Sequence, residues 1–132
     1  EACLVGSEMC IRDSFQGVLR GEPPLHADFL GAELRNADLR YLTVDYIHWV
    51  SSNLSGANFS HSNLYNTDFI YTDLQGVNFG HASLFNVEFS NSDLSGADLS
   101  VLYSHTGVTW TNTICPDGTN SDDNGGTCWN NI

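Results

Sequence analysis

The stretch from Ser52 to Ser100 decides the fold, and it reads SNLSGANFSHSNLYNTDFIYTDLQGVNFGHASLFNVEFSNSDLSGADLS. Within it, a leucine or a phenylalanine returns at every fifth residue. An α-helix does not produce this period, because five helical residues turn the chain by about 500° and successive positions drift around the helix. An ordinary β-strand does not produce it either, because side chains alternate between two faces and a step of five changes face each time.

The remaining solution is a chain that turns a corner every five residues and points one large side chain inward from each short side. Four sides make a square coil of twenty residues, and coils stack at the strand spacing of about 4.8 Å. Residues twenty apart in the sequence then lie above one another in ladders that fill the interior. The predicted core ladder consists of fifteen residues: Phe29, Leu34, Leu39, Val44, Trp49, Leu54, Phe59, Leu64, Phe69, Leu74, Phe79, Leu84, Phe89, Leu94 and Leu99.

The residues around each ladder position follow a pattern of their own. A small residue often stands two places before it, Asp or Asn one place before it, and Gly or Asn two places after it. Gly and Asn tolerate the left-handed backbone that a tight corner requires. Segments such as ADFLG (Ala27–Gly31), ANFSH (Ala57–His61) and ADLSV (Ala97–Val101) show the pattern most clearly.

On these segments, the chain resembles the pentapeptide-repeat family over about residues 25–103. The resemblance implies an all-β fold: a right-handed quadrilateral β-helix of just under four coils. LTVDY and IHWVS (Leu42–Ser51) depart from the pattern through larger residues, so we expect a bulge or a distorted coil there.

Composition narrows the functional classes. The net charge is −12, the chain has no lysine, and no arginine follows Arg40. Such a chain lacks the basic footprint of a nucleic-acid binder, so we expect no nucleic-acid partner. No stretch approaches the length of a membrane-spanning helix. No catalytic or zinc signature is present, so we expect no enzyme activity.

The segments before and after the repeat do not follow the five-residue period. Leu4–Asp13 matches the translation of a sequencing-library adapter, so we expect residues 1–14, with Cys3 and Cys10, to be an artefact or disordered; a natural N-terminal cap is the alternative. Residues 15–24 are a linker or an N-terminal cap. The period stops after Ser104, which makes residues 104–132 a C-terminal cap with a Cys-bounded loop, where Trp110 or Val108 covers the last coil.

Cys115 and Cys128 enclose a polar, glycine-rich loop. Such a loop has little to hold it together, which favours a disulfide over two free thiols, and a disulfide indicates an oxidising compartment. The tail from Asn112 to Cys128 also resembles the ending of exported bacterial members of the family. We therefore expect an exported protein: periplasmic, surface-bound or secreted.

The same loop is rich in oxygen ligands. We considered a calcium site, although the loop is not an EF-hand and turns stabilised by Asx side chains explain the composition at least as well. Apart from calcium, no cofactor is expected. The candidate metal ligands are Asp117, Asn120, Asp122, Asp123 and Asn124.

Two outer columns are candidates for a protein interface, because outward apolar columns are used in partner contacts or self-association. The first column contains Leu30, Val50 and Ile70, and the second contains Tyr65 and Phe85. Packing of neighbours along a β-ladder is the simpler explanation for the second column, whereas for the first both explanations stay open. Tyr41, His61 and His81 form a third column, and we interpret its two histidines as exposed rings and not as metal ligands.

The leading functional hypothesis is a non-catalytic structural or protein-interaction module, exported, with an unidentified protein partner. The alternative, implied by the family resemblance, is an acidic DNA mimic that binds a DNA-gyrase-like partner in the cytoplasm. A third hypothesis is a calcium-binding or adhesive surface protein.

Overall fold

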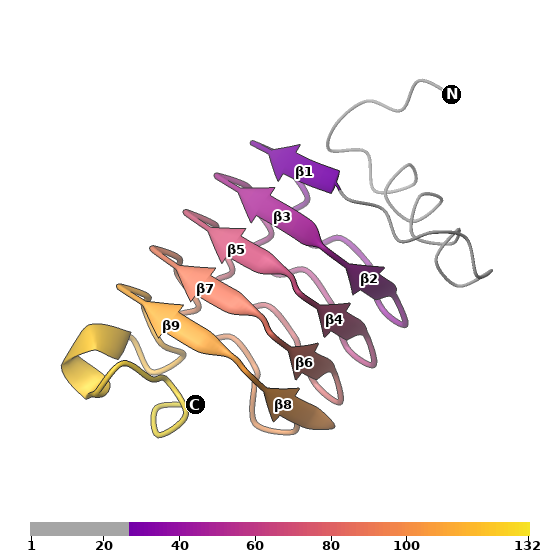
Figure 1. The fold of residues 1–132 in the computed structure, drawn as a ribbon. Coiled ribbons are helices and arrows are strands. Elements are labelled where there is room, and N and C mark those ends of the chain that lie inside the picture. The colour runs from indigo at the N-terminus through magenta and orange to yellow at the C-terminus, as the bar shows by residue number, and fades with distance from the viewer. Residues whose placement is uncertain (1–26) are drawn as a thin grey trace, which may run out of the picture.

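The five-residue period builds two parallel β-sheets along a column of stacked coils (Figure 1). The computed structural model describes residues 27–132, so the expectations for residues 1–14 and 15–24 lie outside the described residues. The first sheet contains β1 (Ala27–Leu30), β3 (Ile47–Val50), β5 (Asp68–Ile70), β7 (Glu88–Ser90) and β9 (Thr109–Thr111). The second sheet contains β2 (Thr43–Asp45), β4 (Asn63–Tyr65), β6 (Ser83–Phe85) and β8 (Ser104–Thr106).

The other two sides of each coil are held by single parallel bridges. The first bridge side runs through Glu33, Asn53, Asp73, Asp93 and Ile114, and the second through Asp38, Asn58, Asn78 and Asp98. From Ala27 to Asp98, partners are twenty residues apart, as in the pairs Phe29–Trp49 and Leu64–Leu84. The predicted all-β solenoid with four-sided coils is confirmed, and it has about four coils. Among residues 27–132, no helix has the length and apolar character needed to cross a bilayer.

The interior is filled by the ladder residues. Fourteen of the fifteen are buried, and Phe29 in the first coil is partly buried against them. Rings stack along the first sheet, with centroid separations of 4.5 Å for Phe29–Trp49 and 5.3 Å for Phe69–Phe89. The Phe59–Phe79 stack faces them edge-on, at 6.3 Å between Phe69 and Phe79. This mixture of stacked and edge-to-face contacts is the geometry that aromatic rings prefer.

Each corner is made by one residue in the left-handed region. Every fifth residue from Gly31 to Gly96 has a positive φ, between 47° and 71°. Gly or Asn occupies eight of these positions, as predicted, but Tyr41, Tyr46, Ser51, His61, Tyr71 and His81 adopt the same conformation. A non-glycine residue is strained in this backbone conformation, and the packing of the interior must offset that strain.

Leu42–Ser51 does not contain the distortion that its large residues suggested. Strands β2 and β3 pair with the strands of the next coil at the ordinary offset of twenty residues. The larger residues fit because Leu42 and Ile47 point inward and are buried, while Tyr46 occupies an outer corner.

A column of buried hydroxyl groups lines the corner that follows the first sheet. The side chains of Ser52, Thr72, Ser92 and Thr113 donate hydrogen bonds to the carbonyls of Phe29, Trp49, Phe69 and Phe89, one coil earlier, at 2.6–3.0 Å. The two serine oxygens also accept backbone N–H groups: Ala32 N–H donates to Ser52 Oγ at 3.3 Å and Thr72 N–H to Ser92 Oγ at 3.0 Å. Because unpaired buried backbone groups are costly, these hydroxyls hold consecutive coils together where the ladder of backbone bonds is interrupted.

The coil continues past Ser104, contrary to the sequence-based expectation. Asp98 still pairs with Asn78, twenty residues earlier, but Ser104 pairs with Ser83, twenty-one residues earlier. One extra residue has been inserted, and Tyr103 and Ser104 together lie opposite Ser83, as in a β-bulge. Beyond the bulge, His105, Trp110 and Cys115 occupy the ladder positions at the same spacing of five.

Trp110 is therefore a core residue and not a cover for the last coil. Its ring stacks on that of Phe89, with 4.7 Å between the ring centroids. Cys115 is fully buried and lies one coil beyond Leu94 in the same ladder. Trp129, which the sequence analysis did not single out, provides the cover: it meets Trp110 edge-on at 5.2 Å and His105 at 4.3 Å. Val108 is partly buried against the same core.

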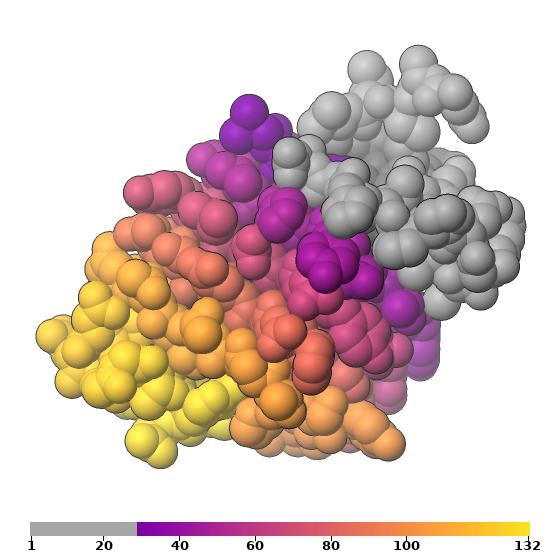
Figure 2. Space-filling view, in the orientation of Figure 1, coloured from indigo at the N-terminus to yellow at the C-terminus, as the bar shows by residue number. Residues whose placement is uncertain are grey.

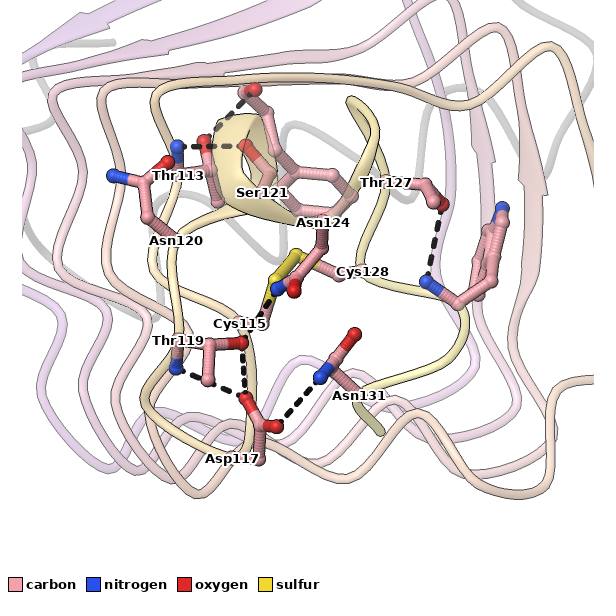
Figure 3. Close-up of a disulfide and its surroundings, with 12 residues drawn as sticks. Thr113, Cys115, Asp117, Thr119, Asn120, Ser121, Asn124, Thr127, Cys128 and Asn131 are labelled. Carbon is pink, nitrogen blue, oxygen red and sulfur yellow. Dashed lines mark hydrogen bonds between the residues drawn. A yellow bond between two sulfur atoms is a disulfide. The ribbon is translucent and has the colours of Figure 1, made fainter.

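The predicted disulfide between Cys115 and Cys128 closes this cap (Figure 3). Both half-cystines are fully buried. The short 3-10 helix η1 (Ser121–Asn124) lies between them, and the Ser121 hydroxyl accepts the N–H of Thr113, so it ends the hydroxyl column. The disulfide is thus attached directly to the end of the core, where it ties the polar loop down.

Replacing Ser92 with alanine is expected to leave the Thr72 N–H without a partner inside the protein and to remove the hydroxyl bond to the Phe69 carbonyl. We expect a loss of about 1–3 kcal/mol in the free energy of unfolding, measured by chemical denaturation. Ser92→Thr is the matched control and should retain most of the stability, because Thr72 and Thr113 make the same bonds in neighbouring coils. Equal stability of Ser92→Ala and the wild type would contradict a structural role for the column.

Reduction of Cys115–Cys128 is expected to release the cap. The closed loop is close to fifteen residues, for which the loss of cross-linking costs about 3 kcal/mol. The experiment uses a Cys3→Ser/Cys10→Ser background, so that the reductant acts on one pair, and follows unfolding together with tryptophan fluorescence, because Trp129 loses its contact with Trp110. An unfolding free energy that does not respond to reductant would show that the loop is held by other contacts.

Candidate functional site

The candidate site lies on the outside of the solenoid, because ladder side chains occupy its interior. Figure 2 shows the side chains of successive coils as parallel bands across the side that carries the two sheets. The sides of the described outer surface carry different kinds of residue. The kind of residue on each side depends on the three residues of each five-residue segment whose side chains point outward.

We call the outward side of the second sheet, with its two bordering columns, the neutral face. Of the nine large apolar side chains that are exposed among the described residues, six belong to this face or its edges: Tyr41, Tyr46, Tyr65, Phe85, Val101 and Tyr103. Tyr65 and Phe85 contact each other across neighbouring coils, at 6.2 Å between ring centroids. Tyr103, made prominent by the bulge, is 82% exposed.

One edge of the neutral face is a column of stacked rings. Tyr41 stacks on His61 and His61 on His81, each at a centroid separation of 5.0 Å. His61 and His81 lie one coil apart, as expected. The described residues contain no group of three His, Cys, Asp or Glu side chains able to share a metal ion. The geometry is that of a packed ring column.

Some of the polar groups of the neutral face are bonded to one another. Asp45, its only carboxylate, accepts a hydrogen bond from Asn66 at 2.7 Å, and Asn66 in turn accepts one from Asn86 at 3.1 Å. Asn63 donates to Thr43 at 3.3 Å. These bonds run along the columns, from coil to coil, so the carboxylate and the amide side chains of the face have partners within the protein.

The predicted column of Leu30, Val50 and Ile70 runs along the first sheet. Leu30 is 68% exposed, whereas Val50 and Ile70 are half-buried against their neighbours. The column becomes polar at Ser90 and Thr111, and His48 and Asp68 form a 2.6 Å contact beside it. It is therefore a shorter apolar surface than the neutral face.

The bridge sides carry carboxylates with internal partners. Burial raises the pKa of Asp93, but hydrogen bonds from Ser95 and Gln75 outweigh it, and the pKa lies below its ordinary value. Hydrogen bonds from Ser100 likewise lower the pKa of Asp98. A shallow groove beside Tyr71 is lined by Asp73, Asp93 and several amide side chains. These sides are acidic and polar.

Four of the five candidate calcium ligands are engaged in hydrogen bonds within the cap. Asp117 accepts hydrogen bonds from Asn131 and Thr119, which lower its pKa (Figure 3). Asp122 Oδ1 accepts the N–H of Asn112. Asn120 accepts the N–H of Asp122, and Asn124 donates to Thr119. Among the described residues, Asp117, Asp122 and Asp123 belong to no group of three His, Cys, Asp or Glu side chains that could share a metal ion. The loop contains turns stabilised by Asx side chains, and calcium binding stays a hypothesis.

Sequence reasoning missed part of the neutral face. Tyr46 and Tyr103 were not singled out, although Tyr46 stands two places after Val44 and so at an outer corner. That position was a usable signal for Tyr46. No signal existed for Tyr103, because its exposure depends on the bulge.

Comparisons with known proteins agree with this geometry. The family model described as "Pentapeptide repeats (8 copies)" matches residues 51–77 and 62–100. A pentapeptide repeat protein from the thylakoid lumen of Arabidopsis thaliana is 29% identical, with a TM-score of 0.65, over 83% of this chain and 75% of its own. QnrB1, a plasmid-mediated fluoroquinolone resistance protein, shares the fold at 14% identity and a TM-score of 0.56, over 63% of this chain and 43% of its own.

Among curated proteins, none matches the chain in sequence. The repeat match and the solved structures point the same way as the register of twenty residues, the left-handed corners and the filled interior. Residues 51–100 of the chain match the pentapeptide-repeat family, and the whole solenoid is similar in fold to solved pentapeptide-repeat proteins.

Proposed function

We propose that this protein is a non-catalytic, exported interaction module, which works by presenting an outer face of its β-helix to another protein. The observation that carries the proposal is the neutral face, where six of the nine exposed large apolar side chains gather. Exposed rings gathered on one side of a protein are typical of contact sites. The ladder side chains leave the interior without room for a substrate, which supports a role for the outside.

Export is supported by the buried Cys115–Cys128 disulfide, because such bonds form and persist in oxidising compartments. The similar protein from Arabidopsis comes from the thylakoid lumen, a compartment outside the stroma. The proposed location is the periplasm, the cell surface or the medium.

An acidic DNA mimic is the second candidate, and the carboxylates of the first bridge side favour it. Glu33, Asp73 and Asp93 lie at the same position in three coils, and the net charge is −12. A gyrase-like partner would then contact a bridge side and not the neutral face. The likeness to QnrB1 supports only the shared fold.

Site-specific photo-crosslinking separates the two candidates. A benzoylphenylalanine is placed at the position of Phe85 on the neutral face or, as the matched control, at that of Gln75, an exposed residue of the first bridge side. In cells of the source organism, we expect protein adducts from the first position and few from the second. Adducts from the Gln75 position alone would favour the DNA mimic, and none from either would contradict the proposed function.

The proposed location has its own test. Cells of the source organism are quenched with acid and alkylated before lysis, so that only free thiols are labelled. We expect Cys115 and Cys128 to be unlabelled in the native protein and labelled only after reduction, because the exported chain is oxidised. Labelling of both cysteines without reduction would place the folded protein in a reducing compartment and contradict export.

A further inference from the structure

The charged side chains are distributed unevenly around the solenoid. Apart from Asp45, every Asp and Glu from Phe29 to Ile132 lies on the first sheet, on a bridge side or in the cap. Asp45 is itself hydrogen-bonded to Asn66. Within the part of the chain that the structure describes, one side is therefore almost free of carboxylates although the net charge of the chain is −12, and the same side carries most of the exposed aromatic rings.

We propose that the neutral face is a contact surface between two copies of this chain. This proposal rests on the proposed function, since it identifies the partner for the same face. Two copies that meet through their neutral faces direct their acidic sides away from each other, whereas a symmetric pairing through the first sheet or a bridge side brings carboxylates together. Like charges placed opposite each other across an interface are strongly unfavourable, so the charge distribution selects this arrangement.

The structure of the face suits a two-fold contact. In a symmetric dimer, the same patch of both copies meets itself, and a flat sheet with rings at regular intervals is complementary to its own copy. The rings of Tyr65 and Phe85 lie at its centre, between the bordering columns that contain Tyr41 and Tyr46. The one carboxylate and the amide side chains of the face are already paired along the columns, so covering these groups does not leave them unsatisfied.

The size of the face sets the strength of the contact. Four strands at about 4.8 Å and five residues per side at about 3.3 Å give a surface of roughly 19 by 16 Å. Stable interfaces bury about 800 Å² on each partner, and the outline of this face, about 300 Å², is well below that size. The dimer is therefore reversible and forms at high protein concentration.

Salt gives the dimer a distinctive signature. Two copies with the same net charge repel each other at long range, and salt screens this repulsion. Association through the neutral face must strengthen as the salt concentration rises. Binding of a basic partner to the acidic sides would weaken under the same change.

Sedimentation velocity over a wide range of protein and salt concentrations tests the proposal. We expect the wild-type protein to shift from monomer towards dimer with concentration, and further at high salt. Phe85→Asp places a carboxylate at the centre of the contact and should abolish the dimer. Tyr71→Asp is the matched control, because Tyr71 is an exposed ring outside the neutral face, and it should dimerise like the wild type.

The circular dichroism and unfolding midpoint of each variant show that the fold is retained; Phe85 is 44% exposed, so the substitution removes little core packing. If Phe85→Asp fails to fold, Phe85→Ser replaces it. A monomer at every concentration and salt, or a dimer that Phe85→Asp leaves intact, would overturn the proposal. Crosslinks from the Phe85 position to a different protein only would also overturn it but would leave the proposed function standing.

Discussion

The left-handed corner at every fifth residue is the constraint on which the rest of the structure depends. A chain that bends there in each segment has only one inward side chain of large size per side, and that side chain must meet its equivalent one coil above and below. The ladders of Trp, Phe and Leu follow from this geometry, as do the flat outer sides. Glycine and asparagine make the corner cheaply, but Tyr41, Tyr71 and His81 show that packing can impose it on other residues.

The corner also creates a need that the hydroxyl column meets. Where the chain turns after the first sheet, buried backbone groups would lack partners, and Ser52, Thr72, Ser92 and Thr113 supply them from the following coil. Two buried donors among the described residues lack a hydrogen-bond partner, namely the indole N–H groups of Trp49 and Trp110. Their rings are retained by stacking with Phe29, Phe69 and Phe89, so ring packing outweighs the loss of these two hydrogen bonds.

The same regularity explains how a solenoid whose interior is filled by side chains can carry a function on its outer surface. Each outward position is repeated once per coil, so a single type of residue at that position becomes a column, and neighbouring columns become a surface. Carboxylates on the bridge sides and rings over the second sheet divide the described surface into acidic and neutral parts. The chemistry of a partner thus determines which side of the solenoid it contacts.

The sequence alone determined the period, the identity of the ladder residues and most of the corners, because each of these depends on a local choice made every five residues. It also favoured the Cys115–Cys128 pair, from the composition of the loop between them. Only the tertiary structure decided the end of the solenoid, because one inserted residue near Tyr103 shifts the frame and hides His105, Trp110 and Cys115 from a search at fixed spacing. The neutral face was likewise decided by the tertiary structure. Its charge depends on which columns of outward residues lie side by side, and that arrangement exists only once the coils are stacked.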